Sequence, residues 1–288
     1  MKIFVIGNGF IADHLPYDRL NIRLDKSNIH HIGSAKNEYG MDVLINCIGK
    51  TGRPNIDWCE THKEETTFAN TILPIRMAEE CARNEIYLIH ISSGCIYFGR
   101  SPNYRWHTDI YGEMKEIDFG WKETDFANPQ SYYSKTKYAC DLILGDMANV
   151  ASLRIRMPIS EKNNPRNLIN KLLKYEKIID IPNSMTLMTD FVRCIEYFVK
   201  NRFSGIYHIT NPQPTSAASI MKEYQKYVPS HNFDIIDERI LDNITLAKRS
   251  NCILNTDKLQ NIGFNMTETQ EGLKKCMAAY VANIGKEN

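Results

Sequence analysis

The chain opens with IFVIGNGFIA (residues 3–12), where an apolar run leads directly into a GxGxxA pattern. Lys2–Ile6 has the compact apolar character of a short buried strand, and the glycines fall where that strand should turn into a helix. Glycines permit a tight turn and let backbone N–H groups approach a pyrophosphate, which the positive end of a helix then favours. The stretch therefore predicts a dinucleotide-binding turn. The residues expected at the cofactor are Gly7, Gly9, Phe10 and Ile11.

Apolar runs and helical stretches alternate beyond this turn. The further strands expected are Asp42–Ile48, Ile86–Ser92 and Ser152–Arg156, and the helices expected are Glu64–Ala82 and Ser131–Ala148. Strands that alternate with helices form a parallel sheet covered on both faces. The sequence therefore predicts the α/β class, with a Rossmann-type doubly wound parallel sheet and a smaller, interleaved C-terminal domain for the substrate.

The division of the chain follows from the same pattern. Residues 1–158 are predicted to form the NAD(P)-binding domain, and residues 159–288 mainly the substrate-binding domain. Gly205–Thr210 again has the composition of a core strand, so about residues 186–212 are expected to return to the first sheet.

Composition and charge exclude several classes of protein. The 35 basic and 34 acidic residues nearly cancel, so no overall field would attract nucleic acid or an anionic membrane. The N-terminal residues lack a signal-peptide pattern, and no apolar run approaches the ~20 residues that cross a bilayer. We expect a cytoplasmic protein whose eight cysteines, without a CxxC pair, are free thiols and bind no metal.

The second strand is expected at Asn21–Asp25, whose end would face the adenosine ribose of the cofactor. Arg23 or Lys26 could meet a 2′-phosphate, whereas Asp25 could accept a hydrogen bond from a free 2′-hydroxyl. The cations favour NADPH, with NADH possible. Both cations could equally be solvated surface residues.

The stretch SYYSKTK (residues 131–137) places Tyr133 and Lys137 four residues apart, on one face of the expected helix. An ammonium beside a phenol favours the phenolate, so Lys137 is expected to lower the pKa of Tyr133 from its ordinary value of about 10 and to hold the nicotinamide ribose. Tyr132 and Lys135 offer a competing register, but they are not four residues apart.

Ser93 lies at the end of the third expected strand, where ligands of an open parallel sheet bind. Its hydroxyl could hydrogen-bond a substrate ketone, while Tyr133 donates a proton to the new alkoxide. Serine, tyrosine and lysine in this order after a glycine turn form a specific constellation, which resembles that of the extended short-chain dehydrogenases/reductases. The alternative is a chance YxxxK on a surface helix.

Six stretches are more specific than the glycine turn. They are GRPNIDWCE (Gly52–Glu60), SYYSKTK (Ser131–Lys137), LRIRMPIS (Leu153–Ser160), NPRN (Asn164–Asn167), IPNSMT (Ile181–Thr186) and ITNP (Ile209–Pro212). Through them the chain, from residue 1 to about residue 260, resembles the bifunctional UDP-4-keto-6-deoxy-glucose 3,5-epimerase/4-keto-reductases of UDP-L-rhamnose synthesis. The resemblance implies epimerisation of this nucleotide sugar at C3 and C5, followed by reduction of C4 with NADPH.

Epimerisation requires a base on one face of the sugar and an acid on the other. Cys95 follows Ser93 by two residues, so in an extended chain both side chains point to the same side. A thiol can exchange protons near neutrality. The resemblance implies that Cys95 acts with Lys171, which lies just after NPRN. Without the resemblance, a packed core thiol and a surface lysine are the simpler interpretations.

The chain departs from the family pattern at two positions. Its glycine motif is one residue shorter than GxxGxxG and ends in Ala12, whose methyl group helix–sheet packing can accommodate. Ser93 replaces a threonine and retains the hydroxyl.

Other residues have two interpretations each. Asn70 matches a position that supports the catalytic lysine through water in this class, but it could be a plain helix-surface residue. Three arginines could contact substrate or diphosphate, or form surface salt bridges. They are Arg53, Arg166 and Arg249. The helices at Glu64–Ala82 and Ser131–Ala148 form the usual dimer surface of the class, so a homodimer is expected by analogy.

Two other functions remain open at this point. One is a dTDP-4-dehydrorhamnose reductase, which acts on an already epimerised sugar and has no epimerase activity. The other is a non-catalytic NAD(P)-binding regulatory protein. The intact set of Ser93, Tyr133 and Lys137 argues against the second.

Overall fold

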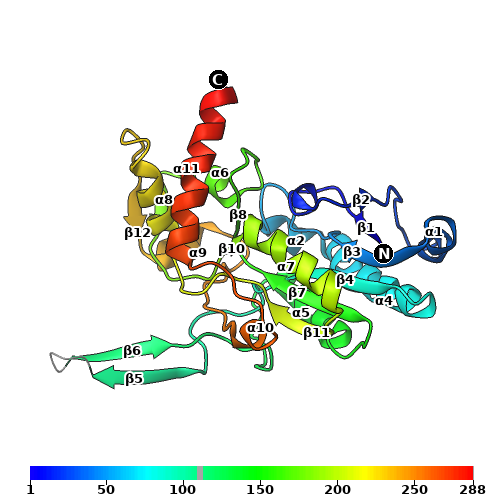
Figure 1. The fold of residues 1–288 in the computed structure, drawn as a ribbon. Coiled ribbons are helices and arrows are strands. Elements are labelled where there is room, and N and C mark those ends of the chain that lie inside the picture. The colour runs from blue at the N-terminus through cyan, green and yellow to red at the C-terminus, as the bar shows by residue number, and fades with distance from the viewer. Residues whose placement is uncertain (109–112, 288) are drawn as a thin grey trace.

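The structure, a computed structural model, describes residues 1–108 and 113–287. Its centre is a six-stranded parallel sheet in the order β11-β7-β4-β3-β1-β2 (Figure 1). The predicted doubly wound α/β class is therefore confirmed. The strands are β1 (Lys2–Ile6), β2 (Asp18–Arg19), β3 (Met41–Asn46), β4 (Tyr87–Ser93), β7 (Val150–Ile155) and β11 (Gly205–His208).

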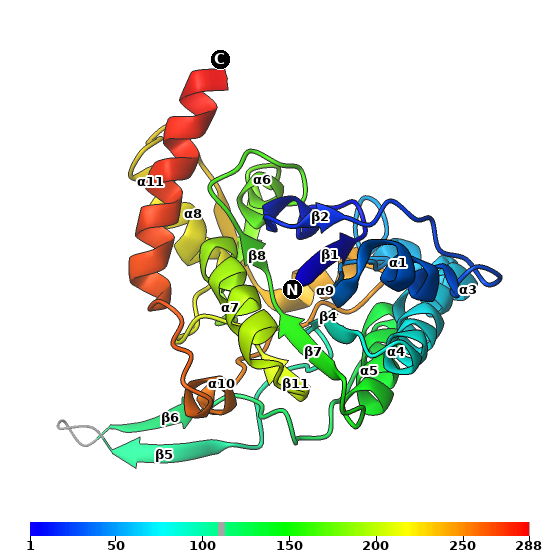
Figure 2. The ribbon, with the colours of Figure 1, turned by 45° about the vertical axis from the view of Figure 1, so that its right-hand side comes forward.

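Helices cover both faces of this sheet (Figures 1 and 2). One face packs against α1 (His31–Tyr39), α4 (Leu73–Arg83) and α5 (Tyr132–Leu144), with Leu44 and Met77 in the shared core. The opposite face packs against α7 (Met188–Asn201), whose core includes two phenylalanines. Burying each such large apolar side chain contributes about 1.5–3 kcal/mol.

The second strand and the first helix differ from the sequence prediction. β2 covers only Asp18–Arg19, so the strand expected at Asn21–Asp25 is wrong. There Asn28 binds the backbone N–H of Asp25 and the carbonyl of Arg23, and these side-chain bonds favour a turn over a strand. The helix expected after the glycine turn is a single 3₁₀ turn, η1 (Ala12–His14), because Pro16 follows it closely.

The helix expected at Glu64–Ala82 is divided into three parts. The three parts are α3 (Lys63–Thr67), a π-helical turn η2 (Phe68–Ile72) and α4. A further short helix, α2 (Asp57–Thr61), precedes them. Pro74 lacks the N–H that would bind the carbonyl of Asn70 in an uninterrupted α-helix. The wider turn accommodates that missing bond and turns Asn70 inward.

A smaller lobe follows the sheet. It contains the strand pairs β8 (Pro158–Ile159) with β10 (Thr186–Leu187) and β9 (Lys177–Ile179) with β12 (Asp234–Ile236). Its helices are α6 (Leu168–Leu172), α8 (Ala217–Gln225), α9 (Glu238–Ile244) and α11 (Thr269–Glu287). The short helix α10 (Asp257–Asn261) packs instead against β11 of the main sheet. The chain leaves this lobe to form α7 and β11, which pairs with β7 in the main sheet.

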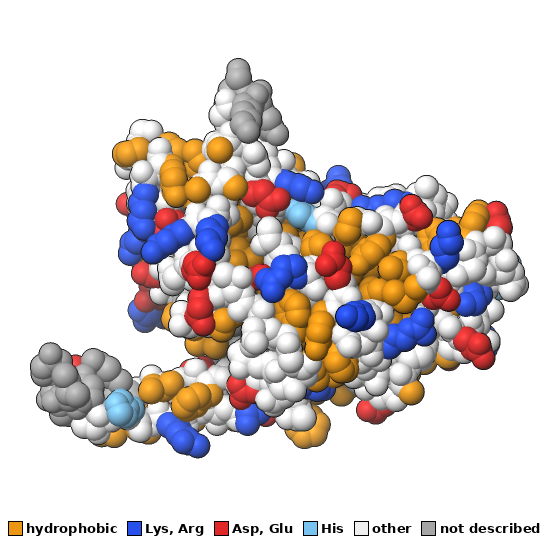
Figure 3. All heavy atoms as spheres, in the orientation of Figure 1, with side chains coloured by type: hydrophobic (Ala, Val, Ile, Leu, Met, Phe, Trp, Pro, Cys, Tyr) orange, Lys and Arg blue, Asp and Glu red, His pale blue; other side chains and the backbone are white. Residues whose placement is uncertain are grey.

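An antiparallel hairpin projects from the body, formed by β5 (Tyr104–Thr108) and β6 (Met114–Asp118) (Figures 1 and 2). Apolar side chains lie exposed along it, including Trp106 and Met114 (Figure 3). This hairpin was not among the elements predicted from the sequence. Within the described ranges, the helices are too short or too polar to cross a membrane.

Candidate active site

The glycine turn after β1 has the geometry of a nucleotide cradle. Gly7 has a φ of 107°, and a Cβ there would lie 2.9 Å from the carbonyl carbon of Cys47, so only glycine fits without strain. A Cβ at Gly9 would have no atom within 4 Å, so the backbone there is open to an approaching group. Both glycines fit the pyrophosphate of a dinucleotide.

Arg19 at the end of β2 closes over this turn. Its guanidinium donates to the carbonyl of Ala12 at 2.5 Å and to that of Gly7 at 3.4 Å. The single turn η1 is too short to have an appreciable helix dipole. The guanidinium of Arg19 therefore supplies positive charge at the glycine turn. Sequence reasoning missed Arg19 because it placed the strand three residues too late. Arg23 is exposed in the loop after β2.

Ser93, Tyr133 and Lys137 come together at the carboxyl end of β4, and all three side chains are buried. The Ser93 hydroxyl hydrogen-bonds the phenol of Tyr133, and Lys137 Nζ donates to the carbonyl of Ile91 at 3.2 Å. Helix α5 is fixed to the strand end by its own first residues. The cap Ser131 accepts from Ser134 N, and Ser134 Oγ donates to the carbonyl of Cys95.

The charges around Tyr133 differ from the sequence expectation. Burial raises the pKa of Tyr133 most, Cys95 raises it further, and the Ser93 hydrogen bond opposes both. Lys137 was expected to lower this pKa, but burial lowers the pKa of Lys137 itself, and its Nζ is bonded to the strand carbonyl. The phenol is therefore protonated near neutrality, as a proton donor must be.

Cys95 lies between this trio and two cations. Its backbone N–H donates to Ser93 Oγ at 3.1 Å, and its half-buried thiol accepts from Arg156 Nη1 at 3.3 Å. Lys171 on α6 approaches from the small lobe. Burial lowers the pKa of Lys171 most and Arg166 lowers it further, whereas the nearby Cys95 raises it. The thiol and the amine predicted for epimerisation are thus near enough for Cys95 to influence the pKa of Lys171.

Arg156 was not singled out from the sequence, although it lies within LRIRMPIS. A lone arginine after a strand usually indicates a solvated surface residue. The signal that could have found it was its place in a stretch shared with the family.

Asn70 is fully buried, so the helix-surface interpretation is wrong. Its side chain accepts from the backbone N–H of Lys50 at 2.8 Å and donates to the carbonyl of the same residue at 2.9 Å and to Thr136 Oγ1 at 3.3 Å. It thereby holds the loop after β3 against α5. A Cβ added at Gly49, in that loop, would lie 3.5 Å from Lys137 Nζ.

The three candidate substrate arginines differ in their contacts. Arg249 forms a two-pronged ion pair with Asp57, at 2.8 and 3.0 Å. Arg166 donates to Thr51 Oγ1 at 2.9 Å and to the carbonyl of Gly52, which joins NPRN to GRPN. Arg53 is exposed. These contacts join the loop after β3 to the small lobe around the site.

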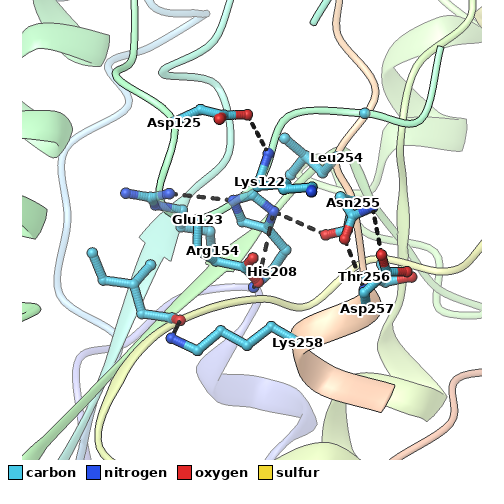
Figure 4. A network of polar contacts seen from close by, with 12 residues as sticks. Lys122, Glu123, Asp125, Arg154, His208, Leu254, Asn255, Thr256, Asp257 and Lys258 are labelled. Carbon is cyan, nitrogen blue, oxygen red and sulfur yellow. Dashed lines mark hydrogen bonds and ion pairs between the residues drawn. The ribbon is translucent and has the colours of Figure 1, made fainter. Parts of the chain in front are cut away.

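A network of polar contacts surrounds the buried ring of His208 (Figure 4). Arg154 forms an ion pair with Asp141 at 2.7 Å, one helical turn beyond Lys137, and also donates to Tyr97 and to His208 Nε2. His208 donates from Nδ1 to the carbonyl of Asn255 at 3.0 Å. Burial, together with the charge of Arg154, lowers the pKa of His208 to about 3, so this ring is neutral.

Comparison with known proteins agrees with this geometry. The family model described as "RmlD substrate binding domain" matches residues 13–282. A bifunctional dTDP-4-dehydrorhamnose 3,5-epimerase/reductase of Arabidopsis thaliana is 36% identical over 81% of this chain and 75% of its own length. The Arabidopsis trifunctional protein RHM2, named as UDP-glucose 4,6-dehydratase, UDP-4-keto-6-deoxy-D-glucose 3,5-epimerase and UDP-4-keto-L-rhamnose-reductase, is 35% identical over 81% of this chain, which spans about a third (34%) of that protein.

Among solved structures, the L780 UDP-rhamnose synthase of Acanthamoeba polyphaga mimivirus superposes with a TM-score of 0.86 at 27% identity. The match covers 97% of this chain and 99% of that one. A dTDP-4-dehydrorhamnose reductase of Bacillus anthracis in complex with NADP has the same fold, with a TM-score of 0.77, 19% identity and coverage of 96% and 98%.

Proposed function

Because the chain belongs to the family of the RmlD substrate-binding domain, we propose that it converts UDP-4-keto-6-deoxy-glucose to UDP-L-rhamnose by 3,5-epimerisation and NADPH-dependent reduction of C4. The observation that carries the proposal is the convergence of a serine, a tyrosine, a lysine and a thiol at the carboxyl end of β4, with a second lysine whose pKa the thiol influences. A reductase alone would need only the first three.

The residues around the glycine turn fit a nicotinamide dinucleotide. Gly7, Gly9, Phe10 and Ile11 would hold the pyrophosphate through the backbone, Lys137 the nicotinamide ribose, and Arg23 the 2′-phosphate. When bound, the reduced nicotinamide supplies a hydride to C4. Ser93 hydrogen-bonds the C4 oxygen and Tyr133 transfers its phenolic proton to it, so the product is the neutral alcohol.

Epimerisation precedes reduction because it depends on the C4 ketone. The protons on C3 and C5 are acidic, since loss of either gives an enolate whose charge rests on the C4 oxygen. One of Cys95 and Lys171 takes the carbon-bound proton, and the other returns a proton to the opposite face. A lowered pKa makes the neutral, basic amine of Lys171 accessible. The hydroxyls of Ser93 and Tyr133 would stabilise the enolate oxygen.

Three arginines would act around the sugar nucleotide. Arg166 and Arg249 support the loop after β3 through their bonds to Thr51 and Asp57, and Arg53 is free to turn toward the diphosphate.

We also propose that the chain forms a homodimer through η2, α4 and α5. Large apolar side chains are exposed on these helical segments. They are Ile72, Leu142 and Ile143, with exposed fractions of 42%, 55% and 48%. A second copy that covers them would gain apolar burial.

The test incubates the protein in D₂O with UDP-4-keto-6-deoxy-glucose and no NADPH, and follows C3 and C5 by NMR. The wild type is expected to take up deuterium at both carbons. Cys95→Ala should lose this uptake, yet bind NADPH and reduce an already epimerised 4-keto sugar. Uptake that is unchanged in Cys95→Ala would remove the thiol from the mechanism.

The same experiment separates the other functions. A reductase without epimerase activity would show no uptake with either the UDP or the dTDP sugar, yet would oxidise NADPH with the epimerised substrate. A regulatory protein would bind NADPH and turn over neither. Comparison of kcat/KM for UDP and dTDP sugars decides the nucleotide.

A further inference from the structure

Arg156 is a buried cation with an unusual set of partners. It follows β7 directly, and its side chain is 1% exposed. Nη1 donates to Cys95 Sγ at 3.3 Å and to Ser250 Oγ at 2.8 Å. Nη2 donates to the amide oxygen of Asn183 and to the carbonyl oxygen of Ser250. None of these four acceptors is a carboxylate.

The contrast with Arg154, two residues earlier, shows what is unusual. Arg154 is equally buried, but Asp141 balances its charge at 2.7 Å. A buried charge is costly unless an opposite charge or a full set of hydrogen bonds compensates it. Of the four acceptors of Arg156, only the thiol of Cys95 can become an anion. Cys95 is therefore the one acceptor among these four that could balance the charge of the guanidinium.

We propose that Arg156 is the positioning residue of the epimerisation, which holds Cys95 Sγ toward the sugar and balances the negative charge that the sulfur carries while its proton is on the substrate. The inference rests on the proposed function, in which Cys95 exchanges protons with the sugar.

The two cations near the sulfur, Lys171 and Arg156, have different roles. Lys171 belongs to the small lobe and has a lowered pKa, so its amine can take up and release a proton in exchange with the sugar. A guanidinium keeps its protons at any physiological pH, so Arg156 can only balance charge and orient. When Cys95 gives its proton to the sugar carbon, an N–H of Arg156 donates a hydrogen bond to the thiolate sulfur. The same hydrogen bond remains once Cys95 is protonated again.

A labelling experiment tests the pair without substrate. Cys95 sulfur displaces iodide from iodoacetamide, which is neutral, or from iodoacetate, which is an anion, and peptide mass spectrometry follows each rate at Cys95. Labelling is done in Lys171→Met, so that the charge of Lys171 does not contribute to the rate. The ratio of the iodoacetate rate to the iodoacetamide rate should exceed that of a free cysteine peptide by about tenfold, because a charged hydrogen-bond donor faces the sulfur.

The variants Arg156→Gln and Arg156→Lys then separate charge from structure. Arg156→Gln should slow iodoacetamide labelling of Cys95 and deuterium uptake at C3 and C5 by about tenfold or more. Arg156→Lys should recover part of both rates, since the cation returns without the fork. NADPH binding and reduction of an epimerised sugar should stay within about twofold of wild type in both. Arg239→Gln, an exposed arginine bonded to Asp237, controls for loss of one positive charge.

Two results would overturn the proposal. One is a reagent ratio in Lys171→Met equal to that of the free peptide, which requires no Arg156 variant to fold. The other is a folded Arg156→Gln that labels and exchanges like the wild type. If Cys95→Ala still epimerises, the proposed role of the thiol fails while the labelling result stands, so the two failures are distinguishable.

Discussion

Tyr133 has two close neighbours with opposite effects on its proton. The Ser93 hydroxyl favours the phenolate, whereas burial and Cys95 oppose it more strongly, so the proton stays on the oxygen. In the direction of reduction this is the useful state, because the C4 oxygen needs a proton as hydride arrives.

Tyr133→Phe should therefore abolish reduction and slow epimerisation without abolishing it, because the Ser93 hydroxyl still stabilises the enolate oxygen. A general acid typically contributes about 100-fold or more to rate, and phenylalanine keeps the ring but removes the proton. NADPH oxidation is followed at 340 nm with an epimerised sugar, and deuterium uptake at C3 and C5 is followed by NMR. Oxidation at the wild-type rate in this variant would exclude Tyr133 as the donor.

Two arginines near the glycine turn should affect the cofactor differently. Arg19 lies on the turn that both NADPH and NADH would use, so Arg19→Ala should weaken the binding of both cofactors by about tenfold. Arg23, in the loop after β2, is proposed to bind only the 2′-phosphate. Arg23→Ala should therefore weaken the binding of NADPH and leave that of NADH unchanged. Fluorescence titration of each variant with each cofactor measures the four dissociation constants. If the ratio of the NADH and NADPH dissociation constants is the same in Arg23→Ala as in the wild type, the 2′-phosphate binds elsewhere.

At the scale of elements, a neutral histidine joins β11 to the strand beside it. His208 ends β11, accepts from Arg154 of β7 through Nε2 and donates through Nδ1 to the loop before α10. Glu123 Oε1 is 3.8 Å from its ring, but this is not an ion pair, because burial keeps the ring unprotonated. Both ring nitrogens are therefore used only while the histidine is neutral (Figure 4).

Because of this network, the free energy of unfolding should decrease as the pH falls. The pKa of His208 is about 3 when folded and near 6.5 when unfolded. The unfolded chain therefore binds the additional proton as pH falls below about 6.5, and stability is lost from there down to about pH 3. Between pH 7 and 5 the loss from this residue is about 2 kcal/mol.

Urea unfolding of wild type and His208→Gln at both pH values measures that contribution. Glutamine keeps a donor and an acceptor but does not titrate, so the loss between pH 7 and 5 should shrink in the variant. An equal loss in both proteins would mean that other groups cause the acid sensitivity.

At the scale of the whole molecule, the proposed dimer predicts a mass of about twice the 33.3 kDa of one chain. Light scattering should show this mass for the wild type. The double variant Leu142→Glu, Ile143→Glu should dissociate to single chains, because a second copy would have to bury two charges. Trp106→Ser, on the projecting hairpin, is the control for loss of an exposed apolar side chain. A single-chain mass for the wild type would exclude the dimer.

The sequence by itself determined whatever depends on neighbours along the chain. Apolar runs marked five of the six strands of the sheet, the glycines marked the turn after β1, and the four-residue spacing placed Tyr133 and Lys137 on one helical face. These features follow from local backbone preferences and side-chain periodicity. The π-helical turn before α4 was foreseeable only from Pro74, whose missing N–H has a local effect.

Only the tertiary structure decided which distant groups meet. Arg156 reaches Cys95 across 61 residues of sequence, and Cys95 also influences the pKa of Lys171, which belongs to another lobe. The resemblance implied the second meeting, but nothing local to Arg156 distinguished it from a solvated arginine. The position of β2, and with it the contact of Arg19 with the turn, was likewise missed. Such pairings depend on how the whole core packs, since each strand and lobe settles where the total burial and hydrogen bonding are best.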